Sequence, residues 1–417
     1  MKYLAFLLCL AVAGPSWAAW TSKNYVISVT GSTVPPGAQA AGFTTLASNF
    51  DFTQSLPANW LGCKPYDGNA HQWYQNNLNY GLPACANISQ VFDSVASSNV
   101  LDIPWLASYP TANGQWSKNG MVTCEGGWDY CTGAGLPPVT QVDYPNAYFE
   151  VVFRVQTTPE MSPQPPGHNL PGSMQAFWML PSNCCGGFSG WETDIAETWN
   201  HYSGCADQNI IDHDSSGGGT GWLLNIAPCA NLDSSVYHTW AVRVTQNSSG
   251  NMGWCGYIDG TITGCHGGIS GTVEKTQRNY LIFWNGIGCN FDNQTGLSGG
   301  PYTDCVNRPI TSVSNCAGAV CVSANVNVNS YVSGMNMYIS GVTGSGAGNV
   351  NGSWTVTQNS GGNWKLNGST WPSGGSPAGG TINPYSKVDM FVKSVRVWSC
   401  ASWQTTMCYG TPLTSAP

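Results

Sequence analysis

Apolar and polar residues alternate in short runs along much of this chain, and this alternation constrains the fold more than any other feature. Residues 148–155, 240–244 and 389–398 are clear examples. Successive side chains of a β-strand point to opposite faces, so such runs predict strands with one buried face. The 51 glycines and 25 prolines recur between the runs and leave little room for long helices. Many short strands bounded by turn residues predict an all-β sandwich.

Residues 1–18 have the pattern of a secretory signal peptide. The charged residue Lys2 precedes the apolar run 3–12, and the small residues Ser16 and Ala18 stand at the third-last and last positions before the expected cleavage. This run is too short to span a bilayer, and no later apolar run is long enough. We therefore expect residues 19–417 to form a secreted, extracellular chain that does not enter a membrane.

Cysteine usage agrees with export. The chain has 17 cysteines, and removal of Cys9 with the signal peptide leaves an even number. In an exported chain this is typical of a disulfide framework, and the absence of a repeated Cys-x-x-Cys spacing disfavours zinc. One near-neighbour pair is expected. Cys255 and Cys265 flank residues 256–264, and a hairpin with a three-residue loop would place them opposite each other.

The composition narrows the class of ligand. Only 8% of the residues are charged, the net charge is -8 with 13 Lys and Arg, and there are 19 Trp and 18 Tyr. Few basic residues argue against nucleic acid, anionic membranes and strongly sulfated polymers. A neutral ligand that presents hydroxyl groups and apolar sugar faces fits this surface better.

Residues 323–375 are expected to form a separate small β module. Asn-Gly and Gly-Gly turn signals stand between alternating runs in this segment, which predicts a meander of hairpins. Runs that belong to the main sandwich flank it on both sides, so the module is expected to be an insertion. It is similar to short β modules of phage tail and surface proteins. Glycan binding and support of the sandwich are both open as its role.

Three acids lie close together in the stretch 191–199. On a strand, Glu192 and Asp194 share a face, whereas Glu197 falls on the opposite face unless the strand contains one extra residue. A β-bulge after Asp194 would align all three. Retaining glycoside hydrolysis needs a carboxylate nucleophile and a carboxylic acid with carboxyl groups about 5–5.5 Å apart. An acid between them could orient the nucleophile and help to keep the proton donor protonated.

An exposed acidic strand and a calcium site are the alternatives for this stretch. Calcium would favour carboxylates together with Asn and carbonyl oxygens on a loop. Here Trp191, Ile195 and Trp199 are interleaved with the acids, which is typical of a semi-buried strand. The catalytic interpretation is therefore preferred.

The pattern Glu192-x-Asp194-x-x-Glu197, preceded by residues 176–181 (Ala-Phe-Trp-Met-Leu-Pro), resembles the signature of glycoside hydrolase family 16. Segments at 237–243 and 256–260 resemble later strands of that family in the same order. The similarity covers about residues 45–300 and 385–400. It implies a jelly-roll, concanavalin A-like β-sandwich that cuts β-glucans or galactans with retention. Family 7 cellulases carry a related motif, but their other segments fit less well.

The resemblance implies a role for each acid: Glu192 as nucleophile, Asp194 as helper acid and Glu197 as acid/base. It also implies that Trp178 stacks on a sugar near the cleaved bond, with a place in the core as the alternative. Three further residues are candidate substrate contacts: His213, Trp191 and Trp199. The alternative for His213 is a position in a turn, and the alternative for the two tryptophans is packing in the core.

The spacing with one extra residue resembles the laminarinase and agarase branches of the family. We therefore expect a retaining endo-glycosidase that cleaves a neutral β-1,3- or mixed β-1,3/1,4-glucan by double displacement. An agarase-like β-galactanase and a non-catalytic, lectin-like polysaccharide-binding sandwich are the alternatives. The expected partner is the polysaccharide alone, with no nucleic acid, and the chain is expected to be a monomer. No cofactor is expected. The resemblance allows a structural calcium ion on the convex face, although no ligand loop is evident.

Overall fold

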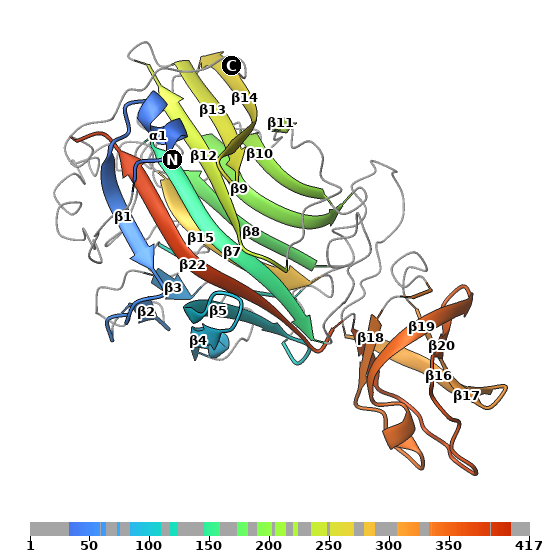
Figure 1. Cartoon of the computed structure of the whole chain (residues 1–417). Coiled ribbons are helices and arrows are strands. Elements are labelled where there is room, and N and C mark those ends of the chain that lie inside the picture. The colour runs from blue at the N-terminus through green and yellow to red at the C-terminus, as the bar shows by residue number, and fades with distance from the viewer. Residues whose placement is uncertain are drawn as a thin grey trace, which may run out of the picture.

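The structure is a computed structural model of the chain, and it shows a β-sandwich with a small β-barrel beside it (Figure 1). It describes residues 33–58, 60–63, 73–75, 84–109, 117–123, 146–158, 173–181, 190–201, 205–213, 220–223, 235–247, 251–270, 279–287, 307–325, 333–334, 336–383 and 385–401. The expected signal peptide, residues 1–18, lies outside these residues. Within them, no helix has the length and apolar character needed to cross a membrane.

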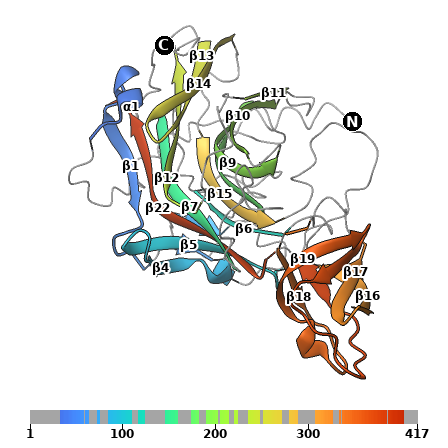
Figure 2. The ribbon, with the colours of Figure 1, turned by 45° about the vertical axis from the view of Figure 1, so that its right-hand side comes forward.

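Two eight-stranded sheets form the sandwich (Figure 2). Sheet A has the order β14 (Thr261–Ser270), β13 (Asn251–Ile258), β12 (His238–Gln246), β7 (Tyr148–Thr158), β22 (Lys387–Ser399), β5 (Ser98–Leu106) and β4 (Ser89–Asp93), and β1 (Thr45–Asp51) also pairs with β22. Sheet B has the order β11 (Thr220–Leu223), β10 (Cys205–His213), β9 (Gly190–His201), β8 (Ser173–Pro181), β15 (Asn279–Ile287), β6 (Ser117–Val122), β3 (Trp73–Gln75) and β2 (Leu61–Gly62). A short helix, α1 (Pro36–Ala40), precedes β1. The all-β sandwich expected from the sequence is confirmed.

The alternating runs account for the core between the sheets. In β22, Val388, Met390 and Val392 belong to this core, whereas the intervening Asp389 and Phe391 point to the other face of sheet A. The face of each sheet that is turned away from the other sheet is called its outer face below. The runs predicted at 148–155, 240–244 and 389–398 lie in β7, β12 and β22.

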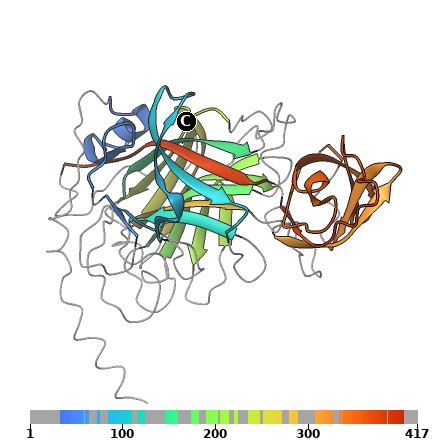
Figure 3. The same cartoon turned by 90° about the horizontal axis from the view of Figure 1, so that it is seen from below.

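A six-stranded closed barrel is inserted between β15 and β22. Its strands are β16 (Arg308–Cys316), β17 (Ala319–Ala324), β20 (Asn363–Leu366), β19 (Gly352–Ser360), β18 (Asn336–Ser340) and β21 (Thr381–Asn383), with the short helix η8 (Ala347–Asn349). The barrel has its own apolar core, which includes Val322, Ile339 and Trp364. It lies to one side of the sandwich (Figure 3). The expected module at 323–375 falls within the barrel, whose strands extend beyond that range at both ends.

The two ends of the barrel are joined to each other and to the sandwich by side-chain amides. The backbone N–H of Asn307 donates to Oδ1 of Asn383 (2.7 Å), and Nδ2 of Asn383 donates to Oδ1 of Asn307 (3.1 Å). Nδ2 of Asn307 also donates to the carbonyl of Tyr109 in the sandwich (3.1 Å). The chain therefore enters and leaves the barrel through one hydrogen-bonded junction.

Three disulfides lie within the described residues: Cys63–Cys85, Cys255–Cys265 and Cys316–Cys321. The pairing expected for Cys255 and Cys265 is confirmed, but the expected loop is wrong. Asp259 and Gly260 form a two-residue turn, both with positive φ (50° and 78°), as is typical of tight hairpins. The two cysteines still face each other because β14 contains one extra residue, Thr263, between its pairings with Gly256 and Tyr257 of β13.

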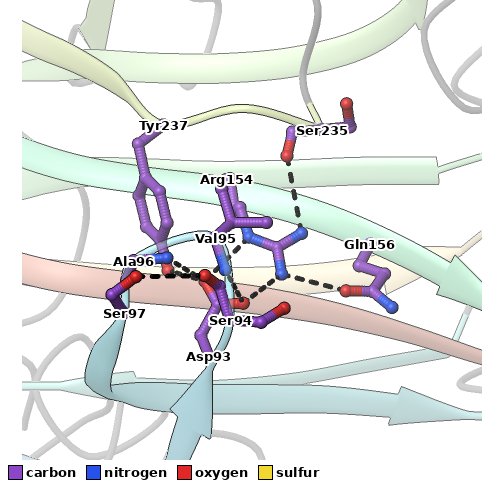
Figure 4. A network of polar contacts seen from close by, with 9 residues as sticks. All are labelled: Asp93, Ser94, Val95, Ala96, Ser97, Arg154, Gln156, Ser235 and Tyr237. Carbon is purple, nitrogen blue, oxygen red and sulfur yellow. Dashed lines mark hydrogen bonds and ion pairs between the residues drawn. The ribbon is translucent and has the colours of Figure 1, made fainter.

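A buried ion pair lies on the outer face of sheet A (Figure 4). Arg154 of β7 donates from Nε (3.0 Å) and from Nη2 (2.6 Å) to the two carboxylate oxygens of Asp93, at the end of β4. The hydroxyl of Tyr237 donates to the same carboxylate (2.6 Å). Burial alone would raise the pKa of Asp93, but the hydrogen bonds from Arg154 and Tyr237 outweigh it and lower the pKa to about 2.

A second polar cluster lies on the same outer face, between β5 and β22. Lys387 contacts Asp389 (Nζ to Oδ1, 2.6 Å) and Asp102 (Nζ to Oδ2, 3.5 Å). Burial and the nearby charge of Asp389 raise the pKa of Asp102 to about 8, although Lys387 opposes this shift. The two carboxyl groups therefore share the ammonium group of Lys387.

Candidate active site

Strand β9 carries all three acids of the predicted motif, and its pairing with β10 contains an irregularity between the second and third acids. Glu197 is opposite Asp207, and Asp194 is opposite Asn209. The step between the two acids is three residues along β9 but only two along β10, so β9 contains one extra residue here. The β-bulge expected after Asp194 is confirmed.

Pairing with β8 identifies the extra residue. Ala196 is opposite Phe177, and Asp194 is opposite Trp178, the next residue of β8, so Ile195 has no opposite residue in that strand. Ile195 and Ala196 both belong to the core between the sheets, as the two residues of a bulge commonly share a side. The extra residue therefore returns Glu197 to the face of Asp194.

The three acids lie on the outer face of sheet B. Trp178, directly opposite Asp194, belongs to an apolar cluster on this face and not to the core between the sheets. Asp194 and Glu197 are buried, with exposed fractions of 1% and 5%, and Glu192 is half-buried. The bulge thus brings together the three acids that the sequence predicted, beside the tryptophan predicted to stack on a sugar.

Asn209 was not identified from the sequence, although it contacts one of the acids. Its Nδ2 donates to Oε2 of Glu197 over 2.9 Å, from the neighbouring strand β10. A hydrogen bond from an uncharged amide fixes the orientation of the carboxyl group and adds no charge to it. The pattern in β10 gives one signal for this role, because Asn209 is a polar residue directly opposite Asp194.

An aromatic cluster lies beside the acids on β8 and β15. Trp284 of β15 packs against Trp178, with ring centroids 6.2 Å apart and planes at 42°. It is opposite two small residues, Ala176 on β8 and Gly120 on β6. Trp284 is half-buried, and Tyr280 on the same strand is buried in the same cluster. Sequence reasoning missed Trp284, since nothing local shows that β15 lies beside β8.

The expectation that Trp191 lines the site is wrong. Trp191 lies in the core between the sheets, where its ring packs on Trp254 at a centroid distance of 5.2 Å. It precedes Glu192 directly, so strand alternation turns it to the opposite face. The side chains of Trp199 and His213 lie outside the described residues, although their backbones belong to β9 and β10.

The structural calcium ion that the sequence allowed stays a prediction. Across the described parts of the chain, no group of three or more His, Cys, Asp or Glu side chains is arranged to hold a metal ion.

No protein-family model matches this chain, and no curated protein sequence matches it. Among solved structures, it is similar to a GH16 protein of the mixed-linkage glucan PUL of Bacteroides ovatus in complex with a product. The identity is 14%, 84% of this chain and 98% of that chain are covered, and the TM-score is 0.42. The catalytic domain of an endo-1,3-β-glucanase (laminarinase) from Thermotoga petrophila RKU-1 is 11% identical, with 86% and 98% covered and a TM-score of 0.38. LamAcat from Zobellia galactanivorans is 12% identical, with 85% of this chain and 98% of that chain covered and a TM-score of 0.37. Likenesses of this strength do not decide the chemistry, which rests on the chain's own residues.

Proposed function

We propose that this chain is a glycoside hydrolase of the family 16 type that cleaves a neutral polysaccharide with retention of anomeric configuration. The observation that supports the proposal is the bulge at Ile195, which aligns Glu192, Asp194 and Glu197 on one face beside Trp178. A binding protein needs no such row of acids, because sugar hydroxyl groups can be bound by amides and single carboxylates. Two carboxyl groups that flank one bond are what retaining hydrolysis requires.

In the proposed reaction, Glu192 attacks the anomeric carbon while Glu197 donates a proton to the leaving oxygen. The glycosyl–enzyme ester that forms is then hydrolysed by a water molecule that Glu197, now a carboxylate, deprotonates. Four ladder positions separate the two residues, so their Cα atoms lie about 13 Å apart. Strand β9 is curved (Figure 1), and the proposed reaction requires the carboxyl groups of the two glutamates to converge to about 5–5.5 Å.

Asp194 and Asn209 serve the two glutamates in this scheme. Asp194, with an exposed fraction of 1%, stands between them and holds negative charge close to the reacting carbon. Positive charge develops on the sugar ring in the transition state, so a buried carboxylate beside it is stabilising. The amide of Asn209 holds the carboxyl group of Glu197 in one orientation through both steps.

The proposed substrate is a β-1,3- or mixed β-1,3/1,4-glucan, cut internally. Only 8% of the residues are charged, and the half-buried Trp284 beside Trp178 offers a ring on which an apolar sugar face can stack. An agarase-like β-galactanase is the second candidate, since the same features suit a neutral galactan. The disulfides support an extracellular site of action. We also propose that the enzyme acts as a monomer.

A polysaccharide panel with matched variants tests this function. The wild-type chain is expected to release reducing ends from laminarin or mixed-linkage β-glucan, and Glu192→Gln is expected to abolish this release while oligosaccharide binding persists. NMR of the first products should show the β-anomer. Release of the α-anomer would overturn the retaining mechanism, full activity of Glu192→Gln would overturn the nucleophile, and binding without release by the wild type would favour the lectin-like alternative.

A further inference from the structure

We propose that Gln208 is a positioning residue, whose buried side chain holds the bulge of β9 and thereby keeps Glu197 in line with the other two acids. This inference rests on the proposed function, which it deepens by naming what maintains the geometry of the site. Gln208 lies in β10 between the residues opposite Asp194 and Glu197, at the point where the register shifts.

The side chain of Gln208 points away from the acids and into the sandwich. Its neighbours Asp207 and Asn209 are opposite two of the acids, so alternation turns Gln208 to the other face. Its exposed fraction is 0%. Burial of an amide in an apolar core is costly unless its polar atoms are hydrogen-bonded.

The amide nitrogen of Gln208 meets this need at the bulge itself. Nε2 donates to the carbonyl of Ile195, the bulged residue, over 2.8 Å, and to the carbonyl of Ala241 on β12 over 3.0 Å. The carbonyl of Tyr257 lies farther from the same nitrogen, at 3.4 Å. A bulge disrupts the local ladder, and Gln208 supplies a donor for a carbonyl of the bulged segment.

The amide oxygen of Gln208 is held from sheet A. Thr263, the extra residue of β14, donates from Oγ1 to Oε1 over 2.7 Å. Gly256 leaves the space for this approach, because a Cβ at that position would collide with Oε1 of Gln208 and with Oγ1 of Thr263. One glutamine therefore links the bulges of the two sheets.

A second link holds β9 on the other side of Asp194. Nε1 of Trp254 on β13 donates to Oγ1 of Thr193 over 3.2 Å. Strand β9 is thus joined to sheet A at Thr193 directly and at Ile195 through Gln208. Because both residues that flank Asp194 are held, the backbone of Asp194 is fixed. The bulge then determines the direction in which the side chain of Glu197 points.

The test is a comparison of Gln208→Met with Gln246→Met. Methionine is unbranched and close to glutamine in size but cannot donate these hydrogen bonds. Gln246 is also fully buried, but it lies on β12 and pairs with Asn146. For Gln208→Met we expect kcat on β-glucan to fall about 100-fold with KM changed less than about threefold, since small misplacements of reacting groups have effects of this size. Gln246→Met should keep kcat while losing a similar amount of thermal stability.

Hydrogen–deuterium exchange provides a readout that does not depend on activity. Peptides that contain residues 193–197 should exchange faster in Gln208→Met than in wild type. In Gln246→Met their exchange rate should equal that of wild type. A folded Gln208→Met that keeps kcat within about threefold of wild type, or an equal loss of kcat in Gln246→Met, would overturn the positioning role. If Gln208→Met does not fold, Gly256→Ala decides by the same criteria, because it displaces Gln208 without removing it. If the wild-type chain hydrolyses no polysaccharide, the proposed function is refuted. The exchange data then test only whether Gln208 stabilises the bulge.

Discussion

Replacement of Asp93 by Ala removes the carboxylate that balances Arg154 on the outer face of sheet A. The side chains of Arg154 and Asp93 have exposed fractions of only 4% and 3%. Besides Arg154 and Tyr237, the backbone N–H groups of Val95 and Ala96 donate to this carboxylate (3.2 and 3.3 Å). The variant would therefore leave one phenol and two turn N–H groups without their acceptor. Arg154 would keep only uncharged acceptors, Oε1 of Gln156 (2.9 Å) and the carbonyl of Ser235 (3.4 Å).

We expect Asp93→Ala to lower the free energy of unfolding by about 3–5 kcal/mol, the usual cost of leaving a buried charge uncompensated. The double variant Asp93→Ala/Arg154→Met removes both charges and should cost less than the sum of the two single variants, by about 2–3 kcal/mol. The pKa of Asp93 adds a dependence on pH. Because it is lowered to about 2, the carboxylate stabilises the fold above about pH 4, and this contribution is lost as the pH falls toward 2.

Urea denaturation at pH 7 and at several values between 4 and 2 measures these quantities. The difference in the free energy of unfolding between wild type and Asp93→Ala should become smaller as the pH falls through this window. The kcat on β-glucan should not change, because the ion pair lies on the face of sheet A that is turned away from sheet B. A loss below about 1 kcal/mol at pH 7 would refute the reasoning, since it would make the pair equivalent to an exposed salt bridge.

Two further predictions concern the other polar cluster of sheet A and the aromatic cluster of sheet B. The pKa of Asp102 is raised to about 8, so wild-type stability should fall as the pH rises from about 4 to 8, with a slope of at most about 1.4 kcal/mol per pH unit. Asp102→Asn should flatten this decline in urea denaturation, and parallel curves for the two proteins would contradict the prediction. Trp284→Ala should weaken oligosaccharide binding about tenfold, or about 1.4 kcal/mol, by loss of ring stacking. Calorimetric titration in the Glu192→Gln background measures this, and unchanged affinity would exclude Trp284 from the binding surface.

Local patterns predicted the strands and the central part of the site. The alternation in β7, β12 and β22 is a property of neighbouring residues, so it can be read without knowledge of strand pairing. The bulge could be predicted because Glu192, Asp194 and Glu197 share a face only if one residue is added. The same alternation places Trp191 on the opposite face from Glu192, so its position in the core was also readable.

Features that depend on pairing between distant segments were not predictable from sequence. Trp284 meets Trp178 only because β15 lies beside β8, and no local pattern records that neighbour. Gln208 breaks the expected rule that amides face solvent, and its burial depends on contacts with Ile195 and Thr263 in two other strands. The loop between Cys255 and Cys265 was assigned one residue too many because a bulge in β14 has the same effect on register as a longer turn.

The position of the barrel in the chain determines the order in which the sandwich can be completed during synthesis. β22 lies between β5 and β7 in the middle of sheet A and also provides the pairing partner of β1. Its residues leave the ribosome after the whole barrel, so sheet A stays divided until residues 387–399 emerge. The barrel, with a core of its own, can close first, and its Asn307–Asn383 junction then brings the start of β22 back to the sandwich. A nascent chain of this design carries a finished small domain and an unfinished large one at the same time, and β22 then converts the second into a stable fold.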